Sequence, residues 1–154
     1  LTTSSAASDV YKRQILHLGL QKKLKIKNPS ITVLGLNPHA GENGKIGAEE
    51  IKKINPAIKV CKEMGINASY AISADTAFNV KKLKQTDAYL AMYHDQALPV
   101  LKALSFGEAV NITLGAPIVR TSVDHGTAID IAGKIKPNLG SIKEAIKAAE
   151  IQLQ

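Results

Sequence analysis

The sequence predicts an α/β fold in which a largely parallel sheet is flanked by helices. Short runs of β-branched and apolar residues alternate with segments of helical periodicity, which is typical of strands joined by crossover helices. Polar loops follow several of these runs, and in open α/β sheets such loops form the ligand-binding edge. The length of 154 residues suits one domain or a piece of a larger one.

Four apolar runs have the length and composition of buried strands. The first is 31–36 (ITVLGL), which is rich in β-branched residues. The others are 68–73, 87–93 and 109–114, and residues 118–119 form a shorter candidate.

Helical periodicity marks most segments between these strands. Residues 48–64 repeat apolar side chains at helical spacing, with Pro56 expected to divide the stretch and Gly65 to cap its end. Further helices or helical turns are expected at 15–20, 80–85, 97–104, 128–132 and 141–153.

Composition excludes several classes of protein. No apolar run approaches the roughly 20 residues that a membrane-spanning helix needs, and residues 1–9 lack the features of a signal peptide. The single cysteine, Cys61, is expected in a helix core and fits a reducing compartment. We therefore expect a cytoplasmic chain with no membrane partner.

The net charge of +7 is carried mainly by scattered lysines. Arg13 and Arg120 are the only arginines and tryptophan is absent, whereas nucleic-acid surfaces usually add arginine and stacking aromatics. We expect no nucleic-acid partner, although a noncatalytic basic binding module remains an alternative that a salt-sensitive DNA or RNA shift would reveal.

Residues 1–14 (LTTSSAASDVYKRQ) differ in composition from the rest and show no helical or strand periodicity. They resemble a foreign end of the kind that sequence assembly leaves behind. We therefore expect this segment to be disordered and residues 15–154 to carry the fold.

Three of the four histidines lie in loops after predicted strands or near them: His39, His94 and His125. At the carboxyl end of a sheet, histidine serves as a metal ligand or as an acid and base. His39 and His94 each follow a buried strand, and together they favour a metal site. His17 lies on an early helix and is interpreted as structural.

A second set of polar residues, Lys102, Asn111 and Arg120, is evenly spaced over successive elements. Two cations and an amide that converge on one pocket suit a substrate with a phosphate or carboxylate. Asp75, Asp95 and Asp124 place carboxylates near the same strand ends. The glycine-rich loop at 41–47 matches neither a P-loop nor a dinucleotide fingerprint.

Four blocks of sequence resemble the C-terminal half of the 4-hydroxythreonine-4-phosphate dehydrogenase family, which serves pyridoxal phosphate synthesis. The blocks are NPHAGE at 37–42, ADTAF at 74–78, MYHDQ at 92–96 and RTSVDHGT at 120–127. The resemblance implies a fold similar to isocitrate and isopropylmalate dehydrogenases, with two domains and a homodimer. It also implies that this chain is a fragment, because family chains are about twice as long.

The resemblance also implies roles for individual residues. His39 and His94 would bind a divalent metal, for which we expect Zn²⁺, with Mg²⁺ or Co²⁺ as alternatives. Asp75 and His94 would be the catalytic residues, and the substrate would be bound by Lys102, Asn111 and Arg120. The residues expected to contact NAD, or alternatively NADP, are His125, Gly126, Thr127, Ala128 and Asp130.

The implied reaction is the NAD-dependent oxidation of 4-phosphohydroxy-L-threonine to a β-keto acid, which loses CO₂ to give 3-amino-2-oxopropyl phosphate. An alternative within the same class is oxidation of threonate or erythronate 4-phosphate. The family's third metal histidine and its His-Thr substrate pair belong to the absent half. We therefore expect this chain to be inactive alone.

Overall fold

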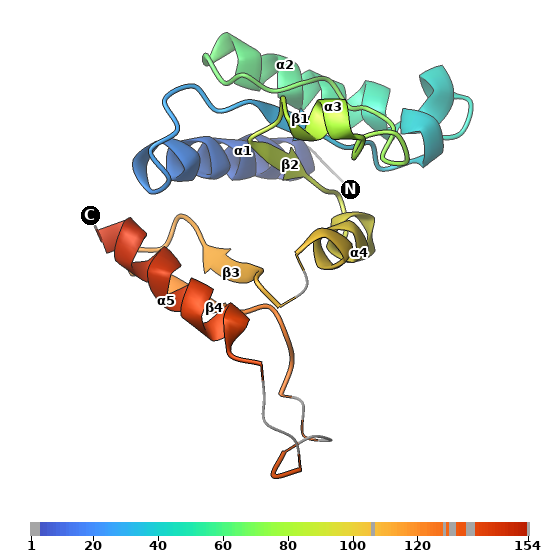
Figure 1. Ribbon diagram of the computed structural model, residues 1–154. Helices are drawn as coiled ribbons and strands as arrows, with labels where there is room; N and C mark the ends of the chain where they lie inside the picture. The colour runs from blue at the N-terminus through green and yellow to red at the C-terminus, as the bar shows by residue number, and fades with distance from the viewer. Residues whose placement is uncertain (1–3, 106, 128, 130–131, 135–137, 154) are drawn as a thin grey trace. The chain divides into compact units, whose positions relative to one another are not determined.

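The computed structural model describes residues 4–105, 107–127, 129, 132–134 and 138–153 (Figure 1). The chain divides into two compact units, Leu1–Leu98 and Pro99–Gln154. The boundary falls inside helix α4 (His94–Leu104). The α/β class predicted from the sequence is confirmed.

The first unit is built around strand β1 (Ile31–Val33), which pairs in parallel with β2 (Ala88–Leu90). Isolated parallel bridges from Ile31 to Ala68 and from Leu34 to Ile72 place a third segment on the other side of β1. β1 is therefore central and fully buried. The predicted strands at 31–36 and 87–93 are shorter than expected, and 68–73 forms only these bridges.

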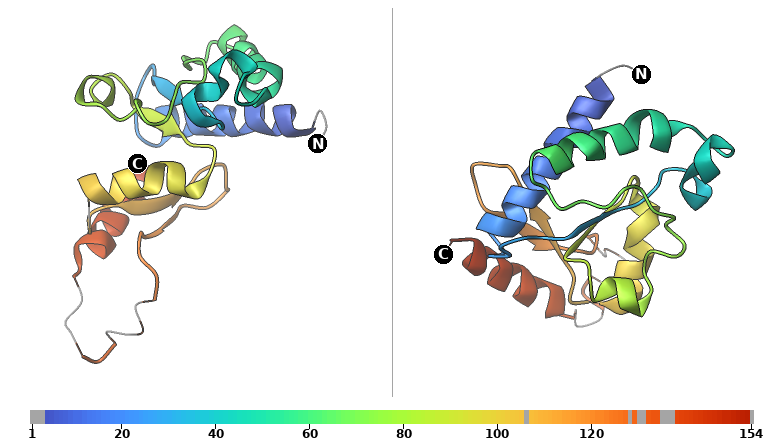
Figure 2. Two further views of the ribbon diagram at one scale, coloured as in Figure 1. Left: turned by 90° about the vertical axis from the view of Figure 1, so that its right-hand side faces the viewer. Right: turned by 90° about the horizontal axis from the view of Figure 1, so that it is seen from above.

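Helices α1 (Ser4–Lys22) and α2 (Asn55–Glu63) contact one another and build the core with the sheet (Figure 2). The core residues are apolar side chains from all of these elements: Leu20, Ile31, Val33, Ile54, Ile58, Cys61, Ile66 and Ala68. The π-helical turn η2 (Glu50–Ile54) precedes α2, so the stretch at 48–64 is divided as expected, and Pro56 lies in the first turn of α2. Gly65 follows with φ +80°, the left-handed conformation of a helix C-terminus.

The prediction of a disordered end is wrong from Ser4 onward, because Ser4–Gln14 form the first part of α1. Val10 packs against the core from this segment. Arg13 is fully buried, and none of its three guanidinium nitrogens has an oxygen or nitrogen hydrogen-bond partner among the described residues. The guanidinium lies close enough to Cys61 to oppose the rise in thiol pKa that burial causes. The foreign origin of the segment stays a prediction.

Two short helical elements complete the first unit. The turn η1 (Pro38–Gly44) follows β1, and α3 (Val80–Leu83) precedes β2. Asn79 caps α3 by accepting a hydrogen bond from the Lys82 N–H. The helix predicted at 97–104 begins earlier than expected, at His94, so Pro99 lies inside α4 and not in its first turn.

The second unit contains an antiparallel hairpin, β3 (Val110–Thr113) and β4 (Arg120–Val123). The expectation of a single largely parallel sheet is therefore wrong for this part of the chain. The short strand predicted at 118–119 is also misplaced, since β4 begins one residue later. The helical turn predicted at 128–132 falls largely outside the described residues.

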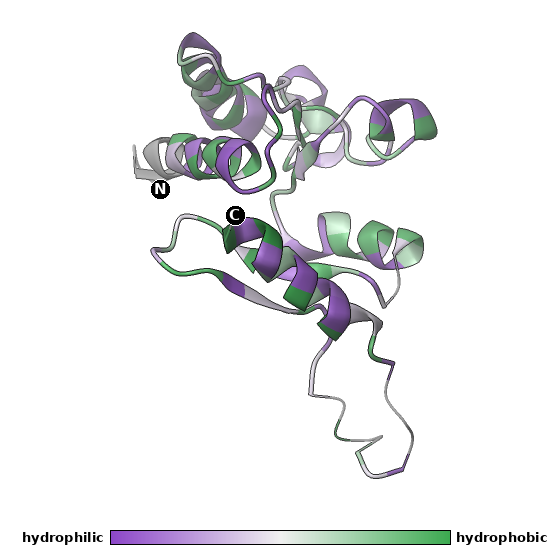
Figure 3. Cartoon of the chain, turned by 60° about the vertical axis from the view of Figure 1, so that its left-hand side comes forward, coloured by the Kyte–Doolittle hydropathy of each residue, from purple (hydrophilic) through white to green (hydrophobic). Residues whose placement is uncertain are grey.

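Helix α5 (Gly140–Leu153) contacts both strands of this hairpin. The Thr121 hydroxyl donates to the Ala145 carbonyl at 2.8 Å, and the Ser141 hydroxyl donates to the Ala109 carbonyl at 2.7 Å. Figure 3 shows hydrophobic and hydrophilic residues alternating around α5. Ser141 and Ala145 are buried, whereas Ile142 and Ile146 are exposed.

A search of the described helices finds none with the length and apolar character needed to cross a membrane.

We predict that Arg13→Met stabilises the chain by about 1–4 kcal/mol, because a buried guanidinium with no oxygen or nitrogen hydrogen-bond partner among the described residues is replaced by an apolar side chain of similar length. Urea unfolding of both proteins measures this difference. Lys12→Met, at the exposed neighbouring position, is the matched control and should change the unfolding free energy little. A loss of stability in Arg13→Met would show that the guanidinium has partners in solution.

Candidate functional site

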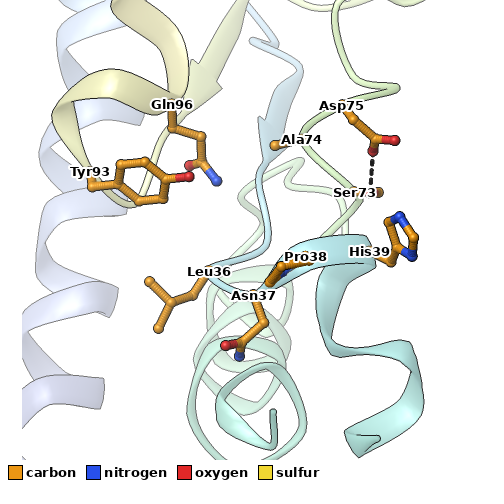
Figure 4. Close-up of a pocket in the computed structure, with 9 residues that line it drawn as sticks. All are labelled: Leu36, Asn37, Pro38, His39, Ser73, Ala74, Asp75, Tyr93 and Gln96. Carbon is orange, nitrogen blue, oxygen red and sulfur yellow. Dashed lines mark hydrogen bonds between the residues drawn. The ribbon is translucent and has the colours of Figure 1, made fainter. Parts of the chain in front are cut away.

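A pocket of about 290 Å³ lies at the carboxyl ends of the parallel strands. Its walls come from the loops after β1 and β2 and from the segment at 73–75 (Figure 4). The lining residues are Leu36, Asn37, Pro38, His39, Ser73, Ala74, Asp75, Tyr93 and Gln96. This is the sheet edge at which the sequence predicted a site.

His39 is presented by an unusual loop. Residues 39–43 of η1 all have positive φ, between 42° and 79°, and form a left-handed turn in which Gly41 is the single glycine. Within this turn His39 Nδ1 lies 2.6 Å from Glu42 Oε1. The hydrogen bond to Glu42, and then its charge, raise the pKa of His39, and Asp75 contributes in the same direction. Nε2 is left as the ring nitrogen for a ligand.

Asp75 lies near His39 at the same end of the pocket (Figure 4). The Ser73 hydroxyl donates to its carboxylate, and this hydrogen bond is the main cause that lowers the pKa of Asp75. The charge of His39 lowers the same pKa further. Asp75 is therefore an ionised carboxylate that can accept a proton or ligate a cation.

His94 begins α4 and is highly exposed, with Nδ1 2.6 Å from Asp95 Oδ1. Its ring is not among the groups that line the pocket, but Tyr93 and Gln96 on either side of it are. The structure thus brings His39 and Asp75 together and places the His94 backbone beside their pocket.

Gln96 joins the two strand ends that carry the histidines. Its side-chain amide donates to the Gly35 carbonyl at 2.6 Å and accepts from the Met92 N–H at 2.7 Å. Gly35 follows β1 and Met92 follows β2, so one buried side chain fixes the spacing of the two loops.

The described residues contain no group of three or more His, Cys, Asp or Glu side chains arranged to hold a metal ion. Imidazole and carboxylate are suitable ligand types for Zn²⁺, but a protein site generally needs at least three ligands. His39, His94 and Asp75 are therefore suitable ligands in kind, but the described residues do not bring the three together as one metal-binding group.

The predicted substrate residues all lie in the second unit. Asn111 and Arg120 occupy neighbouring strands in a register that puts both side chains on the same face of the hairpin. Arg120 donates to the Thr113 hydroxyl at 3.1 Å. Lys102 Nζ donates to the Asp124 carbonyl at 3.2 Å and lies 3.6 Å from its carboxylate, just beyond the end of β4.

The predicted cofactor segment is only partly described. His125, Gly126 and Thr127 are exposed, and His125 Nδ1 lies 3.0 Å from the Gly126 carbonyl. Ala128 and Asp130 lie outside the described residues.

The sequence analysis did not identify the buried polar residues whose hydrogen bonds fix the loops around the pocket, above all Gln96 and Glu50. Glu50 is buried, which raises its pKa, but hydrogen bonds from the backbone and side chain of Asn37 outweigh this and leave the pKa below its ordinary value. One signal was present: a polar residue that interrupts the apolar face of a predicted helix is a candidate for a buried hydrogen bond.

Comparison with known proteins identifies relatives of the whole described fold. Residues 6–149 match the model of the family described as "Pyridoxal phosphate biosynthetic protein PdxA". A 4-hydroxythreonine-4-phosphate dehydrogenase from Chromobacterium violaceum is 56% identical over 137 residues, which are 89% of this chain and 42% of that protein. The resemblance inferred from the sequence blocks is thus confirmed.

Solved structures of dehydrogenases are also similar to this chain. The crystal structure of a 4-hydroxythreonine-4-phosphate dehydrogenase from Klebsiella pneumoniae matches with a TM-score of 0.80 and 34% identity, over 100% of this chain and 48% of that one. A terephthalate 1,2-cis-dihydrodiol dehydrogenase from Burkholderia xenovorans matches with a TM-score of 0.68 and 27% identity, over 94% and 48% of the two chains. The chain spans less than half the length of these relatives.

We predict that Glu42→Gln lowers the pKa of His39 toward the ordinary value for histidine, because the carboxylate that holds the ring proton is removed. The shift of the ring Cε1–H NMR signal with pH measures this pKa, and Glu63→Gln, at an exposed position on α2, is the control.

The raised pKa of His39 determines how the stability of the fold depends on pH at this position. The His39–Glu42 pair stabilises the fold at pH values below the ordinary pKa of histidine, and this contribution is lost as the pH rises through the raised pKa. A metal ion requires the neutral ring, so the same proton competes with metal binding as the pH falls. An unchanged His39 titration in Glu42→Gln would contradict the pairing.

Proposed function

Because the chain belongs to the PdxA family of pyridoxal phosphate biosynthetic proteins, we propose that it is part of a dehydrogenase that oxidises 4-phosphohydroxy-L-threonine. The hydride acceptor is NAD, with NADP as the alternative. The β-keto acid formed then loses CO₂ to give 3-amino-2-oxopropyl phosphate.

The observation that carries this proposal is the pocket at the carboxyl ends of β1 and β2, where His39 and Asp75 meet and the loop of His94 adjoins. When the hydroxyl carbon gives up its hydride, the hydroxyl proton needs an acceptor. Asp75 suits this role because Ser73 and His39 keep it ionised.

Lys102, Asn111 and Arg120 would hold the charged groups of the substrate. The guanidinium of Arg120 can bind a phosphate or carboxylate through two parallel hydrogen bonds, and Asn111 offers an amide on the same face of the hairpin. Lys102 adds a second cation, which the nearby carboxylate of Asp124 orients. The segment that contains His125, Gly126, Thr127, Ala128 and Asp130 would bind the cofactor.

His39 and His94 would contribute two ligands to a divalent metal site, with further ligands supplied by the part of the full-length protein that this chain lacks. We propose Zn²⁺, with Mg²⁺ or Co²⁺ as alternatives. Such an ion acts as a Lewis acid toward an alcohol under oxidation. The full-length protein would be a cytoplasmic homodimer with the two-domain fold of isocitrate and isopropylmalate dehydrogenases.

The same architecture can serve more than one substrate. The match to a dihydrodiol dehydrogenase shows that a similar architecture occurs in a protein with a different substrate. Threonate and erythronate 4-phosphate are therefore alternatives, and turnover of each compound by the same enzyme distinguishes them.

We predict that this chain alone gives no NADH with 4-phosphohydroxythreonine and Zn²⁺ or Mg²⁺, because its described residues do not bring three metal ligands together. Fused to the part of the Chromobacterium violaceum relative that it does not match, the chain should restore turnover on the order of 1 per second. In this chimera His94→Ala should reduce turnover at least about 100-fold by removing a ligand.

His17→Ala is the matched control for that substitution, since His17 lies on α1 and does not line the candidate site. Turnover by this chain alone would show that the missing part is dispensable. Normal turnover in the His94→Ala chimera would remove the ligand role from His94.

A further inference from the structure

We propose that Glu50 is a positioning residue, whose buried carboxylate closes the left-handed loop after β1 and thereby fixes the place of His39 in the pocket. The consequence of Glu50 for catalysis rests on the proposed function, whereas the effect of Glu50 on the loop does not.

The loop needs an external restraint because its backbone conformation is unfavourable. Four non-glycine residues, His39, Ala40, Glu42 and Asn43, have φ between 42° and 55°. L-amino acids adopt this region as single residues and rarely in succession, since Cβ then approaches the following carbonyl. The hydrogen bonds donated by the Ala40, Lys45 and Ile46 N–H groups, at 3.1–3.2 Å, are local to the loop and do not tie it to the rest of the fold.

Glu50 supplies the restraint at the start of the loop. Its Oε1 accepts from the Asn37 N–H at 2.8 Å, and its Oε2 accepts from the Asn37 side-chain amide at 2.9 Å. The Asn37 side chain makes no capping hydrogen bond to the turn that it precedes. The backbone N–H and the side-chain amide of Asn37 thus both donate to Glu50, a residue that follows the loop, and these two hydrogen bonds close the loop.

The same carboxylate also packs against the middle of the loop. A Cβ at Gly41 would lie 2.7 Å from Glu50 Oε2, and a Cβ at Gly35 would lie 3.1 Å from Oε1. Gly35 and Gly41 therefore allow the carboxylate to lie between the end of β1 and the left-handed turn. Glu50 is only 2% exposed, so this contact is shielded from water.

The position of His39 depends on this closure through Glu42. The two side chains meet at 2.6 Å across the left-handed turn. If the turn relaxes, the spacing of residues 39 and 42 changes and the imidazole loses its partner. Glu50 thus acts on His39 without touching it.

The first test is amide hydrogen exchange in the full chain, compared with Glu50→Gln. This isosteric change puts an NH₂ group where an acceptor is needed by Asn37. We expect exchange of the Ala40, Lys45 and Ile46 amides to accelerate at least about 10-fold, with the β1 and α2 amides within about 3-fold of the original rates.

Glu49→Gln is the matched control. Glu49 is the adjacent carboxylate, partly exposed, and accepts from the same Asn37 amide at 2.6 Å. We expect the loop amides of this variant to stay within about 3-fold of the original rates. Unchanged loop exchange in Glu50→Gln, equal acceleration in Glu49→Gln, or equal acceleration of the core amides would each overturn the proposal.

The second test reports on His39 itself. In long-range ¹H–¹⁵N NMR spectra, Glu50→Gln should shift the His39 ring signals toward those of a solvent-exposed histidine and leave those of His94 unchanged. Unmoved His39 signals would overturn the proposal. Neither measurement uses a substrate, so both stand if the chimera proves inactive and the proposed function fails.

In an active chimera, Glu50→Gln should lower kcat at least about 10-fold, because a displaced reacting group reduces turnover. The substrate KM should change less than about 3-fold, since Lys102 and Arg120 lie in the other unit. An unchanged kcat in a variant whose loop amides exchange faster would show that the loop does not position His39 for the reaction.

Discussion

The candidate site depends on one buried amide. Gln96 lies in the first turn of α4, and both polar atoms of its side chain are used: one on the Gly35 carbonyl after β1 and one on the Met92 N–H after β2. Parallel strands end with free backbone groups, and burying such groups unpaired costs about 1–3 kcal/mol each. Gln96 satisfies two of them at once, and in doing so it sets the distance between the loops of His39 and His94.

The chemistry is divided between the two units of the chain. The first unit supplies groups that handle protons or ligate metals, the ionised Asp75 and the imidazole of His39. The second unit carries Asn111 and Arg120 on the β3–β4 hairpin and Lys102 on α4, and we propose that these groups bind the phosphate and carboxylate of a small anionic substrate. The net charge of +7 is consistent with such a substrate. Since the chain spans less than half of its relatives, neither set of residues need be complete.

Several features could be predicted from the sequence because they are local. The apolar runs marked the strands, and the polar residues directly after them marked the pocket, as His39 shows. Helix α5 was predicted almost to the residue from its periodicity. The family followed from four blocks whose order and spacing are specific.

Other features depend on tertiary contacts that the local sequence does not encode. Glu49 and Glu50 are identical in type and adjacent, yet only Glu50 is buried, because the π-helical turn directs it toward Gly35 and Gly41. Nothing in the sequence of residues 39–43 indicates a left-handed turn in which only one residue is glycine. Arg13 is buried against Cys61 by a helix whose sequence has little periodicity, and the β3–β4 pairing reverses the expected strand direction.

The most direct test of the central interaction is the hydrogen-exchange rate of the Met92 amide. This N–H lies beyond the end of β2, and its partner is the Gln96 side chain. Our account predicts exchange slowed at least about 100-fold relative to an unstructured peptide, with the protection lost in Gln96→Leu while the β1 amides stay protected. Exchange of the Met92 amide at the unstructured rate in the unaltered chain would contradict it, because the two strand ends would then not be joined.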